Sequence, residues 1–190
     1  MGRLVVISNR VMVPDSKEKG MAGGLGVAIS DALENRGGIW FGWSGDLVSE
    51  NSYNLKISQS KKTTYAMIDI PEKDFHGFYN GYSNSIIWPL FHYRSDLLEY
   101  HRDYYAKYMR VNQSMAETVE SHLDKEDLIW VHDYHFIPLA RELRRKRCTH
   151  KMGFFLHIPW PAKEVLTILP DHRELVECLL DFDVVGFQTK

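Results

Sequence analysis

Short apolar runs without polar alternation recur along the chain and predict strands. These runs occupy residues 4–7, 39–43, 128–131, 153–156 and 184–187. A continuous apolar run of this length is typical of a strand covered on both faces, as in a parallel sheet. Residues 64–70 alternate more clearly between apolar and polar positions, which predicts a further strand at an edge of the sheet.

Helical patterns separate the apolar runs. The longest spans residues 97–123, where Tyr104, Tyr108 and Val111 begin a series of apolar positions three or four residues apart. Shorter helices are predicted at 25–33, 136–146 and 175–180. This alternation of strands and helices predicts an α/β fold with a Rossmann-like, mostly parallel sheet.

Polar residues follow three of the predicted strands. Arg10 comes after the first, the sequence HDYH at 132–135 after a middle one, and His157 after the next. Ligands of open α/β sheets bind outside the carboxyl ends of the strands. We therefore expect Arg10, Asp133 and His157 to meet in one crevice; the alternative is that these are ordinary strand-end turns.

A glycine-rich loop with the sequence AGGLG at 22–26 precedes the first predicted helix. Backbone N–H groups in such a loop can approach a diphosphate or a sugar phosphate, which the helix N-terminus also favours. The loop is not a dinucleotide-binding fingerprint, because Ile29 stands where the third glycine belongs and no acidic residue closes the second strand. A nicotinamide cofactor is therefore disfavoured.

Other catalytic chemistries find less support in the sequence. His132, His135 and His157 suggest a metal site, but HxxH is not the helical HExxH pair and no cysteine lies nearby. The sequence GWSG at 42–45 lacks the spacing of a serine nucleophile elbow. Asp133 beside histidines could act as a general base or bind sugar hydroxyls.

An aromatic-rich stretch contains Tyr79, Trp88, Phe91 and Tyr93, interleaved with Asn, His and Arg. Rings that stack on apolar sugar faces beside polar partners for hydroxyls suit a carbohydrate. For Phe91 and Tyr93 we expect core packing instead.

The basic run at 141–147 is interpreted as the solvated C-terminal end of a helix, with a phosphate-binding patch as the alternative.

Composition narrows the classes of function. The 190 residues contain 23 Lys and Arg against 25 Asp and Glu, a net charge of −2 that argues against a nucleic-acid binder. No apolar run is long enough to span a membrane, and the N-terminus does not resemble a signal peptide. Cys148 and Cys178 have no disulfide-framework or zinc spacing, which indicates reduced thiols in a cytoplasmic protein.

Seven motifs in order resemble the amino-terminal part of the trehalose-6-phosphate synthases, retaining nucleotide-sugar glycosyltransferases of family 20. They are LVVISNR at 4–10, AGGL at 22–25, WFGWSG at 40–45, WPLFHY at 88–93, WVHDYH at 130–135, GFFLHIP at 153–159 and GFQT at 186–189. The resemblance extends over essentially the whole chain.

The resemblance implies a GT-B architecture, in which two Rossmann-like domains enclose the active site. It implies transfer of glucose from UDP-glucose to glucose 6-phosphate with retention, giving trehalose 6-phosphate and UDP, with no metal or other cofactor. The implied acceptor-binding residues are Arg10, Tyr79, Trp88 and Asp133; the implied donor-binding residues are Gly23, Gly24 and His157; and the implied catalytic residues are Asp133 and His157.

The second domain of that architecture, which would hold the donor nucleotide, has no counterpart in residues 1–190. Lys190 directly follows a predicted strand without a closing helix, so we expect a chain that is cut or continues, and that is inactive alone. The alternatives are a related transferase with another acceptor, such as a glucosylglycerol-phosphate synthase, or a non-catalytic binding subunit. A homo-oligomer is left open.

Overall fold

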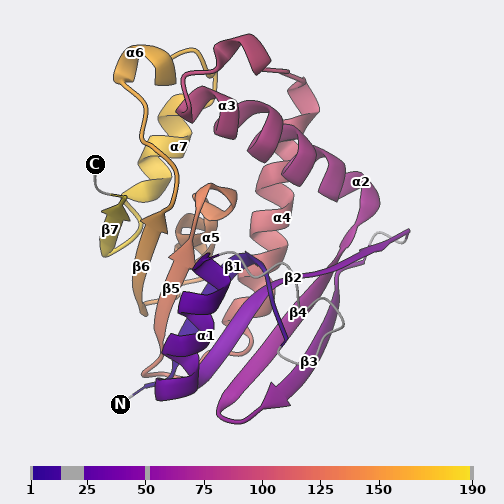
Figure 1. Ribbon diagram of the computed structural model, residues 1–190, viewed down its shortest axis with the longest axis vertical. Helices are drawn as coiled ribbons and strands as arrows, with labels where there is room; N and C mark the ends of the chain where they lie inside the picture. Colours follow the sequence, from indigo (N-terminus) through magenta and orange to yellow (C-terminus); the bar gives the residue numbers. More distant parts are fainter. Residues whose placement is uncertain (1, 14–23, 50–51, 189–190) are drawn as a thin grey trace.

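One sheet organises the computed structural model, which describes residues 2–13, 24–49 and 52–188 (Figure 1). The described residues contain seven strands: β1 (Leu4–Arg10), β2 (Gly38–Val48), β3 (Asn54–Ser60), β4 (Thr63–Pro71), β5 (Leu128–His132), β6 (Lys151–Leu156) and β7 (Val184–Phe187). Their order in the sheet is β3-β4-β2-β1-β5-β6-β7. All neighbouring strands run parallel except β3 and β4, which form an antiparallel hairpin. The α/β fold with a mostly parallel sheet is confirmed.

Helices cover both faces of the sheet. The α-helices are α1 (Gly24–Arg36), α2 (Glu72–Phe75), α3 (Trp88–Phe91), α4 (Arg102–Glu120), α5 (Leu139–Arg145), α6 (Lys163–Leu166) and α7 (His172–Leu179). Shorter or wider helical turns are η1 (His76–Ile87), η2 (Ser95–Leu97) and η3 (Tyr134–Phe136). Within the described ranges, none of these helices is both long enough and apolar enough to cross a bilayer.

The alternation of side chains along β1 divides the core in two. Val5 and Ile7 face the larger core, which helices α4, α5 and α7 and the segment from α2 to α3 complete. Leu4 and Val6 face the smaller core beneath α1. Because both faces of β1 are buried, a continuous apolar run rather than an alternating one encodes this strand.

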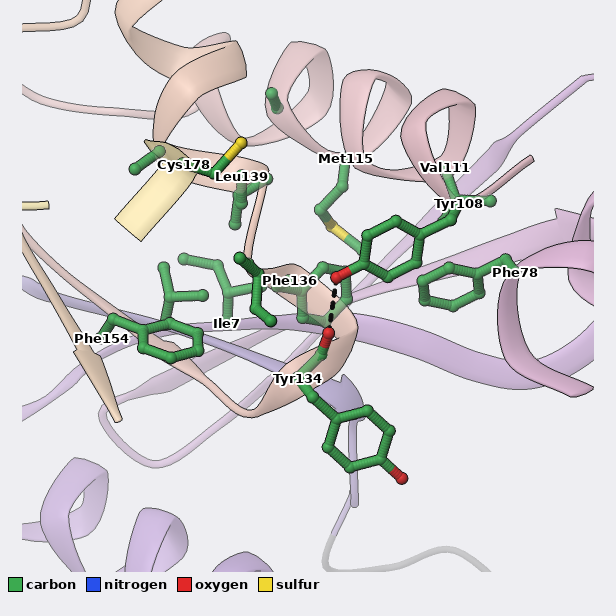
Figure 2. Packing of buried hydrophobic residues seen from close by; sticks show 14 of the residues in the cluster. Ile7, Phe78, Tyr108, Val111, Met115, Tyr134, Phe136, Leu139, Phe154 and Cys178 are labelled. Atoms are coloured by element: carbon green, nitrogen blue, oxygen red, sulfur yellow. Dashed lines mark hydrogen bonds between the residues drawn. The ribbon is translucent and has the colours of Figure 1, made fainter. Parts of the chain in front are cut away.

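Figure 2 shows part of the larger core, in which side chains from β1, β6, α4 and the turn after β5 pack together. The Tyr108 hydroxyl on α4 donates a hydrogen bond of 2.6 Å to the backbone carbonyl of Tyr134, in the turn that follows β5. Asn112, one turn along α4, donates to the carbonyl of His135 at 3.0 Å. These buried bonds satisfy backbone oxygens of the turn after β5 and so fix that turn against α4.

Three sequence predictions need correction. Residues 64–70 do not form an edge strand, because β3 pairs outside β4; the partly exposed sequence of β3 carries too weak an apolar signal to be predicted. The basic run at 141–147 is not simply solvated, because Arg141 and Arg144 bind Asp181 and Asp183 at 2.8 and 3.1 Å. The predicted helices at 97–123 and 136–146 are shorter, since the turns of η2 and η3 lie at their N-terminal ends.

The helix from α2 through η1 to α3 was not predicted, because its middle is a π-helix. Its i→i+5 bonding is shown where the Trp88 N–H donates to the carbonyl of Ser83. Two residues that are nine positions apart lie on opposite sides of an α-helix. In a π-helix nine residues make about two full turns, so the two residues lie on the same side. The π-helix therefore places Tyr79 and Trp88 on the same face, a relation that a search for 3.6-residue periodicity misses.

Gly81 allows this π-helix to approach α4 closely. A Cβ at Gly81 would lie 2.5 Å from the ring of Tyr104. We expect Gly81→Ala to lower the free energy of unfolding by about 1–3 kcal/mol through overpacking, measured by urea denaturation. Gly153→Ala is the matched control, because its Cβ would make only an ordinary 3.7 Å contact with Trp130. Equal stability of the two variants would contradict the close approach.

Candidate functional site at the carboxyl ends of the strands

Three predicted site residues lie at one edge of the sheet. Strands β1, β5 and β6 are neighbours and run parallel, so Arg10, Asp133 and His157 follow the same ends of adjacent strands. The backbone N–H of His157 donates to Oδ1 of Asp133 at 3.3 Å, which joins the loops after β5 and β6. We call this edge, together with the helix face that carries Tyr79 and Trp88, the strand-end site.

Asp133 has an unusual backbone conformation, with φ at 73° and ψ at 166°. This region is almost restricted to glycine, and strain of this kind concentrates at functional sites. The carboxylate Oδ1 accepts the N–H of Tyr134 at 3.0 Å in addition to that of His157. Burial raises the pKa of Asp133, while these backbone hydrogen bonds and the nearby imidazoles of His157 and His92 oppose the rise. The fold thus holds a partly desolvated carboxylate in a fixed direction.

Arg10 and Tyr79 are connected through a tryptophan. The Arg10 guanidinium lies over the ring of Trp43, 5.4 Å from its centroid. The Trp43 ring in turn lies 6.1 Å from that of Tyr79, and the Tyr79 ring stacks on that of His135 at 5.7 Å. A cation and an aromatic ring therefore border the same part of the strand-end site.

The same face of the helix continues from Tyr79 to Trp88. Between them, Asn84 accepts a hydrogen bond of 2.8 Å from the Tyr134 hydroxyl, so this face is directed at the turn after Asp133. Trp88 is 39% exposed and stacks on His92, with ring centroids 4.2 Å apart. His92 donates from Nδ1 to the carbonyl of Trp88 at 2.7 Å, which fixes the histidine beneath an accessible indole.

The three histidines considered as metal ligands do not act together. His132 and His157 approach to 3.0 Å between Nδ1 and Nε2, whereas His135 lies in an aromatic cluster with Tyr79 and Phe78. Among the residues that the structure describes, no group of three or more His, Cys, Asp and Glu side chains could hold a metal ion.

His135 is a neutral, buried histidine that makes the fold sensitive to acid. Burial lowers its pKa from 6.5 to about 3, and neither ring nitrogen has a partner within the described residues. As the pH falls from 6.5 to about 3, the unfolded chain binds a proton at His135 that the folded protein excludes. The stability of the fold therefore decreases as the pH falls through that range.

We therefore expect His135→Phe to stabilise the protein more in acid than at neutral pH. The gain over the original chain should be larger by about 1–2 kcal/mol at about pH 5 than at about pH 7.5, measured by urea unfolding. His101→Phe, which removes an exposed histidine, is the control. An equal gain from His135→Phe at both pH values would show that, at about pH 5, the folded protein binds a proton at His135 as readily as the unfolded chain.

The two glycines predicted to bind the donor are not placed in the strand-end site by any contact among the described residues. Gly23 lies outside the described residues, and Gly24 is the first residue of α1, where a Cβ would meet nothing within 4 Å. Of the two aromatics expected in the core, Phe91 is buried, but Tyr93 is 57% exposed and the prediction for it was wrong. The Tyr93 hydroxyl instead accepts the backbone N–H of Ala162 at 2.8 Å.

Sequence reasoning gave no role to Trp43 and His92, and none apart from metal binding to His132, although each lies within a quoted motif. The signal was present in their positions: Trp43 lies within β2, directly after its buried residues, and His92 comes four residues after Trp88. His132 immediately precedes Asp133 and was considered only as a metal ligand. Their contacts with Arg10, Trp88 and His157 depend on tertiary structure.

The strand-end site combines groups that suit a phosphorylated sugar. A guanidinium recognises phosphate oxygens, aromatic rings cover apolar sugar faces, and a fixed carboxylate accepts hydrogen bonds from hydroxyls. His157 adds a ring nitrogen beside that carboxylate. Such a site can bind and orient a sugar phosphate by charge and shape.

Comparisons with known proteins extend over the whole chain. The profile described as glycosyltransferase family 20 matches residues 3–190. A trehalose-6-phosphate synthase from Enterobacter sp. (strain 638) is 45% identical over 190 residues, which are 100% of this chain and 40% of that protein. The chain therefore spans about 40% of the length of the curated relatives that it matches.

Solved structures agree with that result. An alpha,alpha-trehalose-phosphate synthase (UDP-forming) from Burkholderia xenovorans, in complex with glucose-6-phosphate, is 47% identical with a TM-score of 0.92, covering 99% of this chain and 40% of that one. A structure described as trehalose-6-phosphate from E. coli bound with UDP-2-fluoro glucose is 43% identical with a TM-score of 0.91, covering 100% of this chain and 40% of that one.

Proposed function

The chain belongs to glycosyltransferase family 20, and from that membership we propose that the native protein transfers glucose from UDP-glucose to glucose 6-phosphate. The products are trehalose 6-phosphate and UDP, formed with retention of the anomeric configuration. The match of the family to residues 3–190 carries this proposal. Because the chain spans about 40% of its relatives, the activity is assigned to the native protein rather than to these 190 residues alone.

The strand-end site supplies the acceptor half of the proposed reaction. Arg10 binds the phosphate of glucose 6-phosphate, because a guanidinium can donate two parallel hydrogen bonds to phosphate oxygens. Tyr79 and Trp88, aligned by the π-helix, cover the apolar faces of the sugar. Asp133 accepts hydrogen bonds from acceptor hydroxyls. The Burkholderia relative, which is solved with glucose-6-phosphate, supports this choice of acceptor.

The donor half of the proposal uses His157 and the loop glycines Gly23 and Gly24. His157 lies beside the transferred glucose, within reach of Asp133. The glycines allow backbone N–H groups to approach the donor diphosphate. A second domain would hold the nucleotide, as in the GT-B architecture. The structure of the E. coli protein with UDP-2-fluoro glucose supports a uridine diphosphate donor.

In the proposed mechanism the acceptor hydroxyl attacks the anomeric carbon on the face from which UDP departs. The bond between that carbon and the diphosphate oxygen breaks through an oxocarbenium-like transition state, and the departing phosphate takes the acceptor proton. No protein nucleophile is needed, so Asp133 binds and orients the acceptor. Catalysis is by positioning and electrostatic stabilisation.

We also propose a cytoplasmic location. Cys148 and Cys178, which both lie in the described part of the chain, are free and buried. Burial raises the pKa of both thiols, for Cys178 to about 12, so neither is a reactive thiolate. Unpaired cysteines of this kind are typical of a reducing compartment.

Calorimetric titration of the native-length protein with sugar phosphates tests the acceptor assignment. We expect glucose 6-phosphate to bind more tightly than glucose by about 10-fold or more, because the phosphate adds charge-assisted hydrogen bonds. Equal affinity for the two ligands would contradict a phosphate site. Tighter binding of a phosphorylated three-carbon polyol would instead favour the related transferases with another acceptor.

A further inference from the structure

The ring of His157 is held by a second histidine. His132, the last residue of β5, is 1% exposed and places Nδ1 at 3.0 Å from Nε2 of His157. The two rings lie at an interplanar angle of 27°, with centroids 5.3 Å apart. Trp130 packs on the outer side of His132 at 4.2 Å, and Phe155 packs on His157 at 4.7 Å. Both rings are therefore fixed in orientation.

A hydrogen bond between two neutral imidazoles needs one hydrogen between the two nitrogens. In one arrangement, His132 donates from Nδ1 and its Nε2 is a bare acceptor. In the other, His157 donates from Nε2, and His132 must carry its own hydrogen on Nε2. The two arrangements give His157 opposite tautomers, so the environment of His132 decides which nitrogen of His157 is protonated.

That environment favours the first arrangement. Nε2 of His132 is buried and has no hydrogen-bond partner among the described residues. A buried N–H without an acceptor is rarer in folded proteins than an acceptor that lacks a donor, because the lost hydrogen bond is costly. His132 therefore keeps its hydrogen on Nδ1 and donates it to His157. Nδ1 of the half-buried His157 then carries that ring's hydrogen.

Both the hydrogen bond between the two rings and their burial oppose protonation of His132 and His157. A cationic His157 would direct an N–H from Nε2 at His132, whose hydrogen would have to move to the buried nitrogen. Burial lowers the pKa of His132 to about 3, and a charge on the neighbouring His157 would lower it further. Burial also lowers the pKa of His157, although the Asp133 carboxylate opposes the shift. Trp130 and Phe155, the other packed neighbours, are uncharged.

We propose that His132 is a positioning residue that holds His157 as the neutral Nδ1–H tautomer, so that His157 donates a hydrogen bond to a sugar or phosphate oxygen in the strand-end site. His157 is then a hydrogen-bond donor and not a general acid or base. Only the identity of the ligand rests on the proposed function. The tautomer and its dependence on His132 follow from the contacts within this chain.

Nitrogen-15 NMR of the imidazole rings in the native-length protein measures the tautomer directly. We expect His157 to show a protonated Nδ1 and a bare Nε2 near neutral pH. In His132→Phe the donor is lost, and His157 should shift toward the Nε2–H tautomer that free histidine prefers in water. In His132→Asn the side-chain amide can donate from the place of Nδ1 and should restore the original tautomer.

Two outcomes would overturn the proposal: an Nε2–H tautomer at His157 in the unaltered protein, or the same tautomer with and without His132. The measurement on the unaltered protein decides the first point even if His132→Phe does not fold. His101→Phe, at an exposed site, is the control for general effects of removing a histidine and should leave His157 unchanged.

Kinetics give a second measurement that a purely structural role would not move. We expect His132→Phe to lower kcat/KM for the donor by about 10- to 100-fold while KM for the acceptor stays unchanged, and His132→Asn to recover most of the loss. Equal losses for Phe and Asn would contradict the positioning role. If the NMR results agree but no transfer is detected in any variant, the proposed function fails and the tautomer assignment stands.

Discussion

Replacing Asp133 by asparagine is expected to lower kcat/KM for the proposed glucosyl transfer by about 30- to 1,000-fold, because hydrogen bonds to a charged, desolvated group are among the most costly to lose. The fold should be retained. The asparagine oxygen can accept the same N–H groups of Tyr134 and His157 that the carboxylate accepts now. Asparagine has the same shape as aspartate, so it makes the same demand on the backbone at φ 73° and ψ 166°.

Stability should move in the opposite direction to activity. Because burial raises the pKa of Asp133, the folded protein keeps a proton that the unfolded chain has already released, and ionisation at neutral pH destabilises the fold. Asp133→Asn removes that cost, so its stability relative to the original chain is highest above the raised pKa. The advantage should disappear as pH falls to the ordinary value of 3.8.

The measurement pairs initial rates with urea unfolding over a range of pH. Asp69 is a suitable control, because it is another buried carboxylate, bound by Ser44 and Lys56 and outside the strand-end site. Asp69→Asn should lose stability through its broken ion pair without the loss of acceptor recognition. Unchanged activity in Asp133→Asn would contradict the assignment of Asp133 to the acceptor.

Removing the guanidinium of Arg10 is expected to weaken binding of glucose 6-phosphate by about 10- to 100-fold, since it deletes charge-assisted hydrogen bonds to phosphate. Binding of glucose should change little. The Arg10 guanidinium lies against Gly45, since a Cβ on Gly45 would lie 2.5 Å from Nη2 of Arg10. Gly45 lies in β2 with a φ of +99°, a backbone conformation that favours glycine.

Arg10→Lys should recover only part of the affinity, because an ammonium is a point charge and cannot donate the two parallel hydrogen bonds of a guanidinium. Calorimetry on Arg10→Ala and Arg10→Lys, with glucose as the second ligand, separates the phosphate contribution from the sugar contribution. Arg173→Ala is the control, since the Arg173 side chain is 86% exposed and pairs with Glu177 on α7. An equal loss for glucose and its phosphate would show that Arg10 does not read the phosphate.

Strand β1 could be predicted because it is buried on both faces. Val5 and Val6 face different cores, and both are inaccessible, so their strand appears as an unbroken apolar run. The edge strand β3 could not, because half of its residues face solvent and its partner is a hairpin neighbour.

The candidate site was partly accessible from the sequence. Arg10, Asp133 and His157 follow neighbouring parallel strands, and the ends of such strands meet by topology alone. The joint orientation of Tyr79 and Trp88 could not be derived from periodicity, because it depends on the π-helix. The strained backbone of Asp133 and the contact between His132 and His157 arise only when loops from different strands pack together.

Product analysis with the native-length protein tests the central claim most directly. UDP-glucose and glucose 6-phosphate are supplied together and singly, and UDP and sugar phosphates are quantified. We predict UDP release that depends on glucose 6-phosphate, matched one for one by a non-reducing disaccharide phosphate. Binding of glucose 6-phosphate without any such product, or UDP release that is independent of the acceptor, would contradict the account and favour a non-catalytic binding protein or a different acceptor.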